Sequence, residues 1–291
     1  MKIEINFSII VYRNLREEFI LKTYKIGEIA KLLGISAETI RNYEKKGLIE
    51  PYKEDSNYRY FDIIQVNHLF NIQKFQKYGY NLHEIKEIMN ESTLKEAEHS
   101  LINKEKELLN EAFYLNLKIN SVNATINFMM QAQNAKQECF LGERPPLYRL
   151  NYQKNHELVI DERVQEEVVK WLKYADLTFM SGSIQLNAMM NLGKDFDFGF
   201  CLDKRTAEFL GIHENDIVQY YDSCPAIVFY YEATPKNDIE GISKMILEYA
   251  NEHQLRIVGE SISRVIFARL RDEEEYHISH LVWIPYEKKE S

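Results

Sequence analysis

The sequence has only three cysteines and eleven glycines in 291 residues, and no apolar run approaches membrane-spanning length. Cys139, Cys201 and Cys224 are far apart and form no CxxC pair, so we expect reduced thiols in a cytoplasmic protein. The glycines form no phosphate-binding loop, and neither HExxH nor GxSxG occurs. These absences argue against an enzyme, and we expect no catalytic residues, cofactor, metal or membrane partner.

The stretch from Tyr24 to Asn90 has the pattern of several short helices. Apolar residues at helical spacing end at Gly34, and Ser36 is suited to cap a second helix over 37–46. Pro51 and the polar residues that follow predict a hairpin, or wing. Asp62 can cap a third helix that ends at Gly79, and a short fourth helix follows. We expect the third helix to have an apolar side formed by Ile63, Ile64, Val66, Leu69, Phe70 and Phe75.

The second helix and the hairpin carry side chains suited to DNA. We expect contacts to the major groove or its flanking phosphates from Thr39, Arg41, Asn42, Tyr43 and Lys45, and contacts to the backbone from Tyr58, Arg59 and Tyr60. The formal net charge is −9, and residues 24–91 balance ten basic against ten acidic residues. DNA affinity must therefore come from local placement of charge and from two domains acting together in a dimer.

This stretch resembles the winged helix-turn-helix of MerR-type transcription regulators over residues 23–91. The resemblance is carried by Tyr24–Ala30, Gly34–Ser36, Thr39–Arg41, Tyr43–Ile49, Tyr58–Tyr60, Gly79–Leu82 and Ile85. The chain departs from the family at Asn42, where a second tyrosine is usual, and at Asn57, where glycine is usual. The resemblance implies a homodimeric regulator that distorts promoter DNA, with RNA polymerase as a partner at the promoter.

Residues 92–134 show a seven-residue repeat without proline or glycine. One heptad position is filled by Leu94, Leu101, Leu108, Leu115, Val122 and Met129, and the companion position by Ala112, Ile119 and Ile126. A helix of this length spans roughly 60 Å, and its seam predicts pairing with the same helix of a second subunit. The resemblance adds that this coiled coil is antiparallel. The alternative is a solitary amphipathic helix packed on its own domains.

The two ends of the chain differ from these regions. Residues 1–22 have no counterpart in the family, and we expect a disordered leader or an early start codon there. Pro145 and Pro146 predict a stiff linker after the long helix. Beyond it, the order strand, helix, strand, strand occurs twice, with helices over 161–174 and 238–253 and strands over 147–152, 178–186, 196–202, 226–232, 263–270 and 276–285. We expect an internally duplicated α+β domain.

Residues 145–291 resemble the GyrI-like effector-binding domain of multidrug-sensing MerR-type regulators. The residues that carry the resemblance are Ala226–Tyr231, Glu248–Ala250, Gly259 and Val282–Pro285. The family places a ligand-facing glutamate at the position of Ser263. The charge of the ligand, which is cationic in the family, is therefore left undecided by this sequence. The whole chain then reads as an all-α winged helix-turn-helix domain, a long dimerisation helix and a duplicated α+β effector domain.

Alternating aromatic residues on strands can line a site for a flat aromatic or hydrophobic ligand, including a cationic one. The candidates are Tyr148, Tyr152, Trp171, Phe198, Tyr230, Glu232, Glu260 and Trp283. Most of these side chains are also suited to an ordinary core. Two alternatives to a drug-like sensor stay open: a metal- or redox-responsive regulator, and a GyrI-like domain with hydrolase activity in which Glu232 and Tyr230 do acid-base work.

Overall fold

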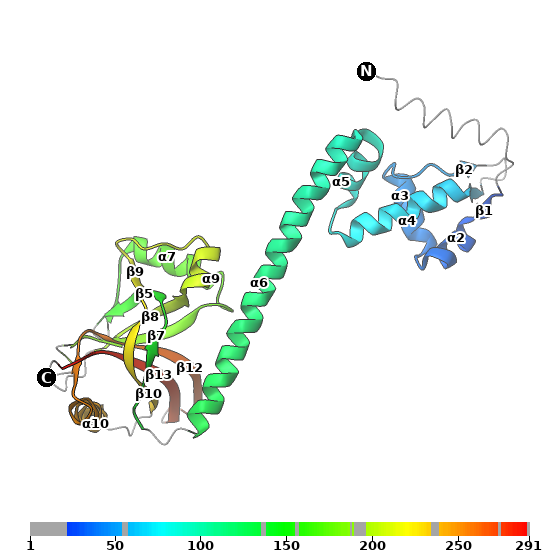
Figure 1. The fold of residues 1–291 in the computed structure, drawn as a ribbon. Helices are drawn as coiled ribbons and strands as arrows, with labels where there is room; N and C mark the ends of the chain where they lie inside the picture. Colours follow the sequence, from blue (N-terminus) through cyan, green and yellow to red (C-terminus); the bar gives the residue numbers. More distant parts are fainter. Residues whose placement is uncertain are drawn as a thin grey trace. The chain divides into compact units, whose positions relative to one another are not determined.

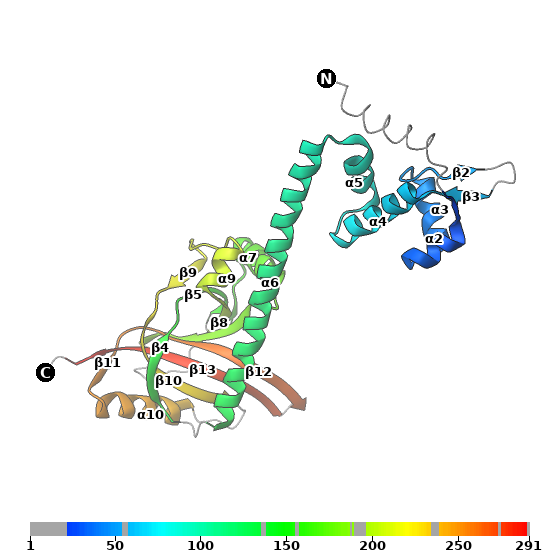
Figure 2. The same ribbon diagram turned by 45° about the vertical axis from the view of Figure 1, so that its right-hand side comes forward.

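The computed structural model describes residues 22–53, 58–134, 138–154, 157–186, 188, 196–233, 239–272 and 275–289. The expected leader lies outside these residues except for Lys22. The chain divides into two compact units, with the boundary at Glu111. Figures 1 and 2 show both units, which are described separately below.

The N-terminal unit begins with two helices joined by a tight turn. The helices are α2 (Ile26–Leu33) and α3 (Ala37–Lys45). Gly34 adopts φ 65° at the turn, a left-handed conformation that glycine tolerates without steric cost. The Ser36 hydroxyl accepts from the Thr39 amide at 3.0 Å and caps α3. The predicted helix-turn-helix is confirmed.

The wing is a small three-stranded sheet with the order β1-β3-β2. Its strands are β1 (Tyr24–Lys25), β2 (Tyr52–Lys53) and β3 (Arg59–Phe61), and Tyr52 lies opposite Tyr60. Residues 54–57, where a hairpin tip was expected, lie outside the described residues. Arg59 is the first residue of β3 and lies opposite Lys53.

Helices α4 (Ile63–Lys77) and α5 (Leu82–Lys86) and the π-helical turn η1 (Glu87–Glu91) follow the wing. Asp62 caps α4 as predicted, because its carboxylate accepts from the Gln65 amide at 2.8 Å. Two side chains expected on the apolar side are instead exposed: Ile63 at 47% and Phe70 at 58%. Val66 and Leu69 are buried as expected, and they share the core with residues of the neighbouring elements, including Ile29, Ile40, Leu48, Phe61, Ile72 and Ile85.

Helix α6 (Leu94–Asn134) is a single helix of 41 residues. Most of the expected heptad positions are exposed, including Leu94, Leu108, Leu115, Val122, Ile119 and Ile126. A different side of the helix packs into the C-terminal unit, where Leu117 is only 4% exposed and Phe113 and Tyr114 join the same core. The helix therefore has one side packed on the C-terminal unit and a second apolar side that is largely exposed among the described residues, except at Met129, which packs on that unit.

The C-terminal unit is built on an antiparallel sheet whose central order is β10-β13-β12-β7-β8-β5. These strands are β5 (Leu147–Lys154), β7 (Phe179–Ile184), β8 (Asp197–Asp203), β10 (Cys224–Ala233), β12 (Ser261–Asp272) and β13 (Glu275–Lys288). With α7 (Glu162–Leu172) and α10 (Ile239–Glu252), they give the order strand, helix, strand, strand twice. The sheet order is symmetric about the β7–β12 pair, as expected for a duplicated unit.

The sheet extends beyond the predicted strands. At one edge, β4 (Phe140–Arg144) pairs with β10 and ends just before Pro145, so this edge strand was not predicted. At the other edge, β6 (Glu157–Leu158) and β9 (Val218–Tyr221) pair with β5, while β11 (Leu255–Ile257) pairs with β13. A short helix, α9 (Lys204–Phe209), follows β8.

The two faces of this sheet differ. Helices α7 and α10 cover one face, where Trp171 packs with Leu150 and Ile246 packs with Ile227. Side chains alternate along a strand, so the neighbouring residues point to the opposite face. That face bears Arg149, Ser181, Cys201, Arg264 and Trp283, and is called the arginine face below. Phe128 and Met129 of α6 pack against part of it.

None of the helices in the described ranges has the length and apolar character needed to cross a membrane.

Candidate functional site

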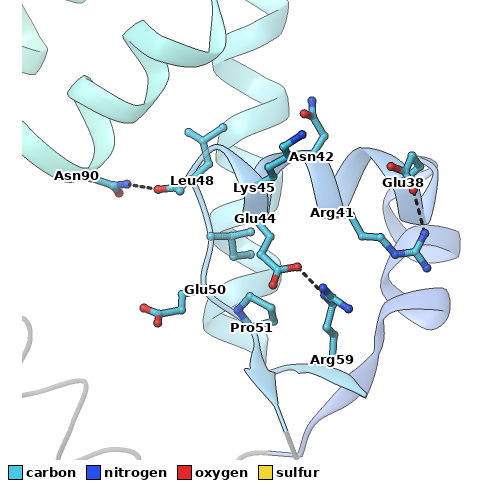
Figure 3. A pocket seen from close by; sticks show the side chains of 12 residues that line it. Glu38, Arg41, Asn42, Glu44, Lys45, Leu48, Glu50, Pro51, Arg59 and Asn90 are labelled. Carbon is cyan, nitrogen blue, oxygen red and sulfur yellow. Dashed lines mark hydrogen bonds and ion pairs between the residues drawn. The ribbon is translucent and has the colours of Figure 1, made fainter. Parts of the chain in front are cut away.

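Helix α3 presents a set of exposed polar side chains on the N-terminal unit. Arg41, Asn42 and Lys45 are exposed, while Ile40 on the opposite side is completely buried in the core. These three residues line a hollow with the turn at 47–51 and Arg59 (Figure 3). Buried Ile40 fixes the rotation of the helix, and capping by Ser36 fixes its start. The outward side chains are therefore held on a rigid element, which suits contact with a nucleic-acid groove.

Acidic residues partner the basic groups of this hollow. Arg59 donates from Nε to Glu44 Oε2 at 2.5 Å and so ties β3 to α3, and Arg41 donates from Nη1 to Glu38 at 3.0 Å (Figure 3). Glu44 is largely buried, whereas Glu38 is 80% exposed. The exposed Arg41–Glu38 ion pair contributes little free energy, so Arg41 can exchange Glu38 for a phosphate at small cost. Arg59 has a structural role beside any phosphate contact.

Tyr43 was expected to contact DNA, and the structure places it elsewhere. Its side chain is 3% exposed, and its hydroxyl donates to Gln76 Oε1 of α4 at 2.6 Å. Burial raises the pKa of Tyr43. The expectation was wrong because Tyr43 lies three residues after Ile40, on the core-facing side of α3. Tyr43 therefore holds α3 against α4.

The remaining candidates stay at or near the surface. Tyr58 is 62% exposed, with the Lys25 ammonium 6.0 Å from its ring centroid. Tyr60 and Thr39 are half-buried, and the Thr39 hydroxyl is hydrogen-bonded to Ser36 at 2.8 Å. The structure thus brings Arg41, Asn42, Lys45 and Arg59 around one hollow and leaves Tyr58 on the wing. Their contacts with DNA stay predictions.

The sequence comparison decides the identity of this unit. Residues 24–92 match the model of the MerR HTH family regulatory protein. These residues form a MerR-type helix-turn-helix domain. The mercuric resistance operon regulatory protein of Bacillus cereus is 39% identical over 67 residues, which are 23% of this chain and 51% of that protein. The ZntR homolog of Haemophilus influenzae is 42% identical over 67 residues, 23% of this chain and 50% of that protein.

The chain spans about half the length of the curated relatives it matches, and the matched half is the MerR-type domain. These relatives are named as regulators, not as enzymes. Solved structures with a wider overlap are similar only at low scores. An EcmrR–DNA complex in EcmrR-RPo covers 91% of this chain and all of its own chain, with TM-score 0.34 and 16% identity. The structure of SAV2435 bound to tetraphenylphosphonium covers 52% of this chain and 94% of its own chain, with TM-score 0.31 and 13% identity.

The candidate ligand residues of the C-terminal unit do not gather in one place. Trp171 has no exposed surface and donates from Nε1 to Glu167 at 3.2 Å, so it packs the core beneath α7. Tyr148, Tyr152 and Phe198 alternate onto the same helix-covered face. Tyr152 packs against Phe200 with ring centroids 4.9 Å apart. These four aromatics serve the core and its edge.

Two of the predicted residues lie on the other face. Trp283 and Tyr230 are buried beside Phe128 and Met129 of α6, and the Tyr230 hydroxyl donates to Gln131 of that helix. Glu232 is at an exposed strand end, paired with His277 at 3.0 Å and Arg269 at 3.7 Å. Glu260 accepts from Tyr221 and from the Gln185 amide. Both carboxylates therefore have partners within the protein, and neither is a deeply buried negative charge that needs a cationic ligand to balance it.

The sequence analysis did not identify the two arginines of the arginine face, of which Arg149 is buried and Arg264 half-buried. Arg149 is 1% exposed, and burial lowers the pKa of Arg264 to about 10, which leaves it charged at neutral pH. Arg149 lies two residues after Leu147, and Arg264 two residues after Ile262, so strand alternation places each arginine on the same face as an apolar side chain. That signal was available in the sequence. Within the described ranges, no group of three or more His, Cys, Asp or Glu side chains is arranged to hold a metal.

Proposed function

We propose that this chain is a homodimeric DNA-binding transcription regulator whose C-terminal unit senses a small molecule. The observation that carries the proposal is the MerR-type domain itself, with Arg41, Asn42 and Lys45 exposed on a helix fixed by its buried side. A helix so presented fits the major groove, where side chains read base edges and phosphates. We propose the promoter, and RNA polymerase bound there, as its site of action.

The exposed side of α6 supports the dimer. Leu108, Leu115 and Val122 are 44%, 57% and 58% exposed and repeat every seven residues. Pairing with a second copy buries such a seam and presents two recognition helices to two half-sites. Each fully buried leucine contributes about 1.5–3 kcal/mol relative to its exposed state. Several of them, counted twice by symmetry, are enough for a stable coiled coil.

The C-terminal unit is in direct contact with the same helix, which supports a sensory role. Phe113, Tyr114 and Leu117 join one of its cores, and Tyr114 donates to Asp176 at 2.9 Å. Phe128 joins another core on the arginine face. A ligand that binds better to one packing of this unit on α6 therefore biases the helix that continues into the MerR-type domain. We propose that the unit is a GyrI-like effector domain and that the switch distorts promoter DNA.

The proposal is tested by titrating DNA from upstream of the gene with the purified full chain and following fluorescence anisotropy. Lys45→Ala should weaken binding and lower the salt slope by about one phosphate contact. Arg41→Ala should weaken binding and alter sequence preference. Lys106→Ala is the matched control, because it removes an equally exposed lysine from α6, outside the recognition helix. Equal effects of all three variants would remove α3 from the interface.

A further inference from the structure

The arginine face holds one buried cation, Arg149, and one half-buried cation, Arg264, and both are next to Ser181. Arg149 donates from Nε to Ser181 Oγ at 3.1 Å and from Nη2 to the Asp197 carbonyl at 3.2 Å. Ser181 lies directly opposite Arg264 in the β7–β12 pair. Both guanidinium groups therefore belong to the same small region of the sheet, although their strands are far apart in the chain.

These arginines have buried donors that the protein leaves unused. Arg149 Nη1 and Arg264 Nε and Nη2 are inaccessible and have no hydrogen-bond partner. Arg264 stacks on Phe179, 3.1 Å from the ring centroid, and approaches the Phe128 ring at 4.9 Å. Aromatic faces attract the cation, but they accept none of the N–H groups that lie in the guanidinium plane. Stacking therefore accounts for the position of the Arg264 guanidinium but leaves its buried N–H donors without acceptors.

Arg264 forms no ion pair with a carboxylate of the described residues, although the negative charge of Asp203 opposes the lowering of its pKa by burial. The acidic groups nearby are already engaged, since Asp203 accepts from the Thr206 amide and hydroxyl and Glu260 accepts from Tyr221 and Gln185. Burial raises the pKa of the Cys201 thiol, so this neighbour stays neutral and does not balance the charges. Buried charges in proteins are normally paired, and two like charges on one face of a sheet disfavour each other.

We propose that Arg149 and Arg264 hold the acidic group of a small anionic ligand, a carboxylate or a phosphate, on the arginine face. Guanidinium groups match such oxyanions with pairs of parallel hydrogen bonds. The buried hydroxyl of Ser183, which also has no partner, adds a further donor on the same face. The C-terminal unit as a whole is acidic, with 16 basic and 25 acidic residues over 147–291, so this buried positive charge is local.

This inference rests on the proposed sensory function and gives it a ligand class opposite in charge to the cation that the family resemblance implies. It also places the ligand next to α6, because Phe128 of that helix contacts Arg264. An anion that draws Arg264 out of its aromatic stack changes the contact between the sheet and the helix. The charge of the ligand thereby affects the packing of α6, the helix that leads to the MerR-type domain.

The test is a set of thermal melts and calorimetric titrations of the full chain with salicylate, inorganic phosphate, neutral benzamide and the cation tetraphenylphosphonium at constant ionic strength. We expect saturable binding and a higher melting temperature with salicylate or phosphate. Arg149→Gln and Arg264→Gln should each weaken that binding at least tenfold, while Arg163→Gln, on the exposed surface of α7, leaves it unchanged. The proposal is overturned if benzamide or tetraphenylphosphonium raises the melting temperature. It is also overturned if neither salicylate nor phosphate does so.

A second variant separates binding from folding. Arg264→Met keeps the length of the side chain but removes the unpaired charge, so the ligand-free protein should melt at the same temperature or higher while losing anion binding. A lower melting temperature would assign Arg264 to the core and overturn the proposal. Promoter binding is measured on the same samples. If the protein binds the promoter but no anion, only this inference is refuted. If it binds an anion but not the promoter, only the proposed function is refuted.

Discussion

Two leucines on α6, two residues apart, separate the packing of the helix on its own chain from pairing with a second subunit. Leu117 is 4% exposed in the C-terminal unit, and Leu115 is 57% exposed on the heptad side. Leu117→Ala should cost about 3 kcal/mol through lost burial and a cavity. For a unit of this size, that loss lowers the melting temperature by roughly 6–12 °C.

Leu115→Ala should behave in the opposite way. The exposed side chain contributes little to the C-terminal unit, so the melting temperature of that unit at low concentration should change by less than about 2 °C. Each dimer loses two copies of the side chain, about 3 kcal/mol together. The dissociation constant should therefore rise about a hundredfold.

The assay is calorimetric melting combined with sedimentation velocity over a dilution series. The reasoning is refuted if Leu115→Ala melts as low as Leu117→Ala, or if it leaves the dimer dissociation constant unchanged. A chain that is monomeric before any substitution would contradict the coiled coil directly. Leu115→Met, which nearly preserves volume, is the matched control and should dimerise like the original protein.

Three further predictions follow from individual contacts. Ser36→Ala removes the cap of α3 and should destabilise the MerR-type domain by about 1 kcal/mol in denaturant titrations, whereas an unchanged midpoint would contradict the capping role. Tyr43→Phe loses the hydrogen bond to Gln76 and should cost about 1 kcal/mol without altering the salt slope of DNA binding; an altered slope would return Tyr43 to the interface. Burial lowers the pKa of His280 from 6.5 to about 4, so the unfolded chain takes up the proton first. Stability should fall as pH drops from about 6.5 to about 4, by about 3 kcal/mol in total, and His280→Gln should remove that part of the pH dependence.

The sequence predicted most of the elements because their local signals agree. Ser36, Gly34 and Asp62 mark helix ends through capping and left-handed geometry, and the six predicted strands correspond to β5, β7, β8, β10, β12 and β13. The strand β4 was missed because Phe140–Arg144 shows no alternation and is followed by two prolines. Its pairing with β10 is a tertiary contact that no local pattern specifies.

The candidate sites were harder to predict because side-chain chemistry was given more weight than position. Tyr43 has a plausible DNA-binding side chain but a core-facing position, and Trp171 is an aromatic residue whose helix turns it into the core. Arg149 and Arg264 show the converse, since charge suggests the surface while alternation places them inside. In each of these cases the period of the element decided the outcome.

The most direct measurement of the central claim is in vitro transcription from the promoter upstream of the gene, with RNA polymerase, the full chain and its Arg41→Ala and Lys45→Ala variants. The account predicts that the full chain changes the amount of transcript, that either substitution reduces the change, and that Lys106→Ala does not. Transcript levels that are the same with and without the protein, at concentrations where it occupies the promoter, would contradict it.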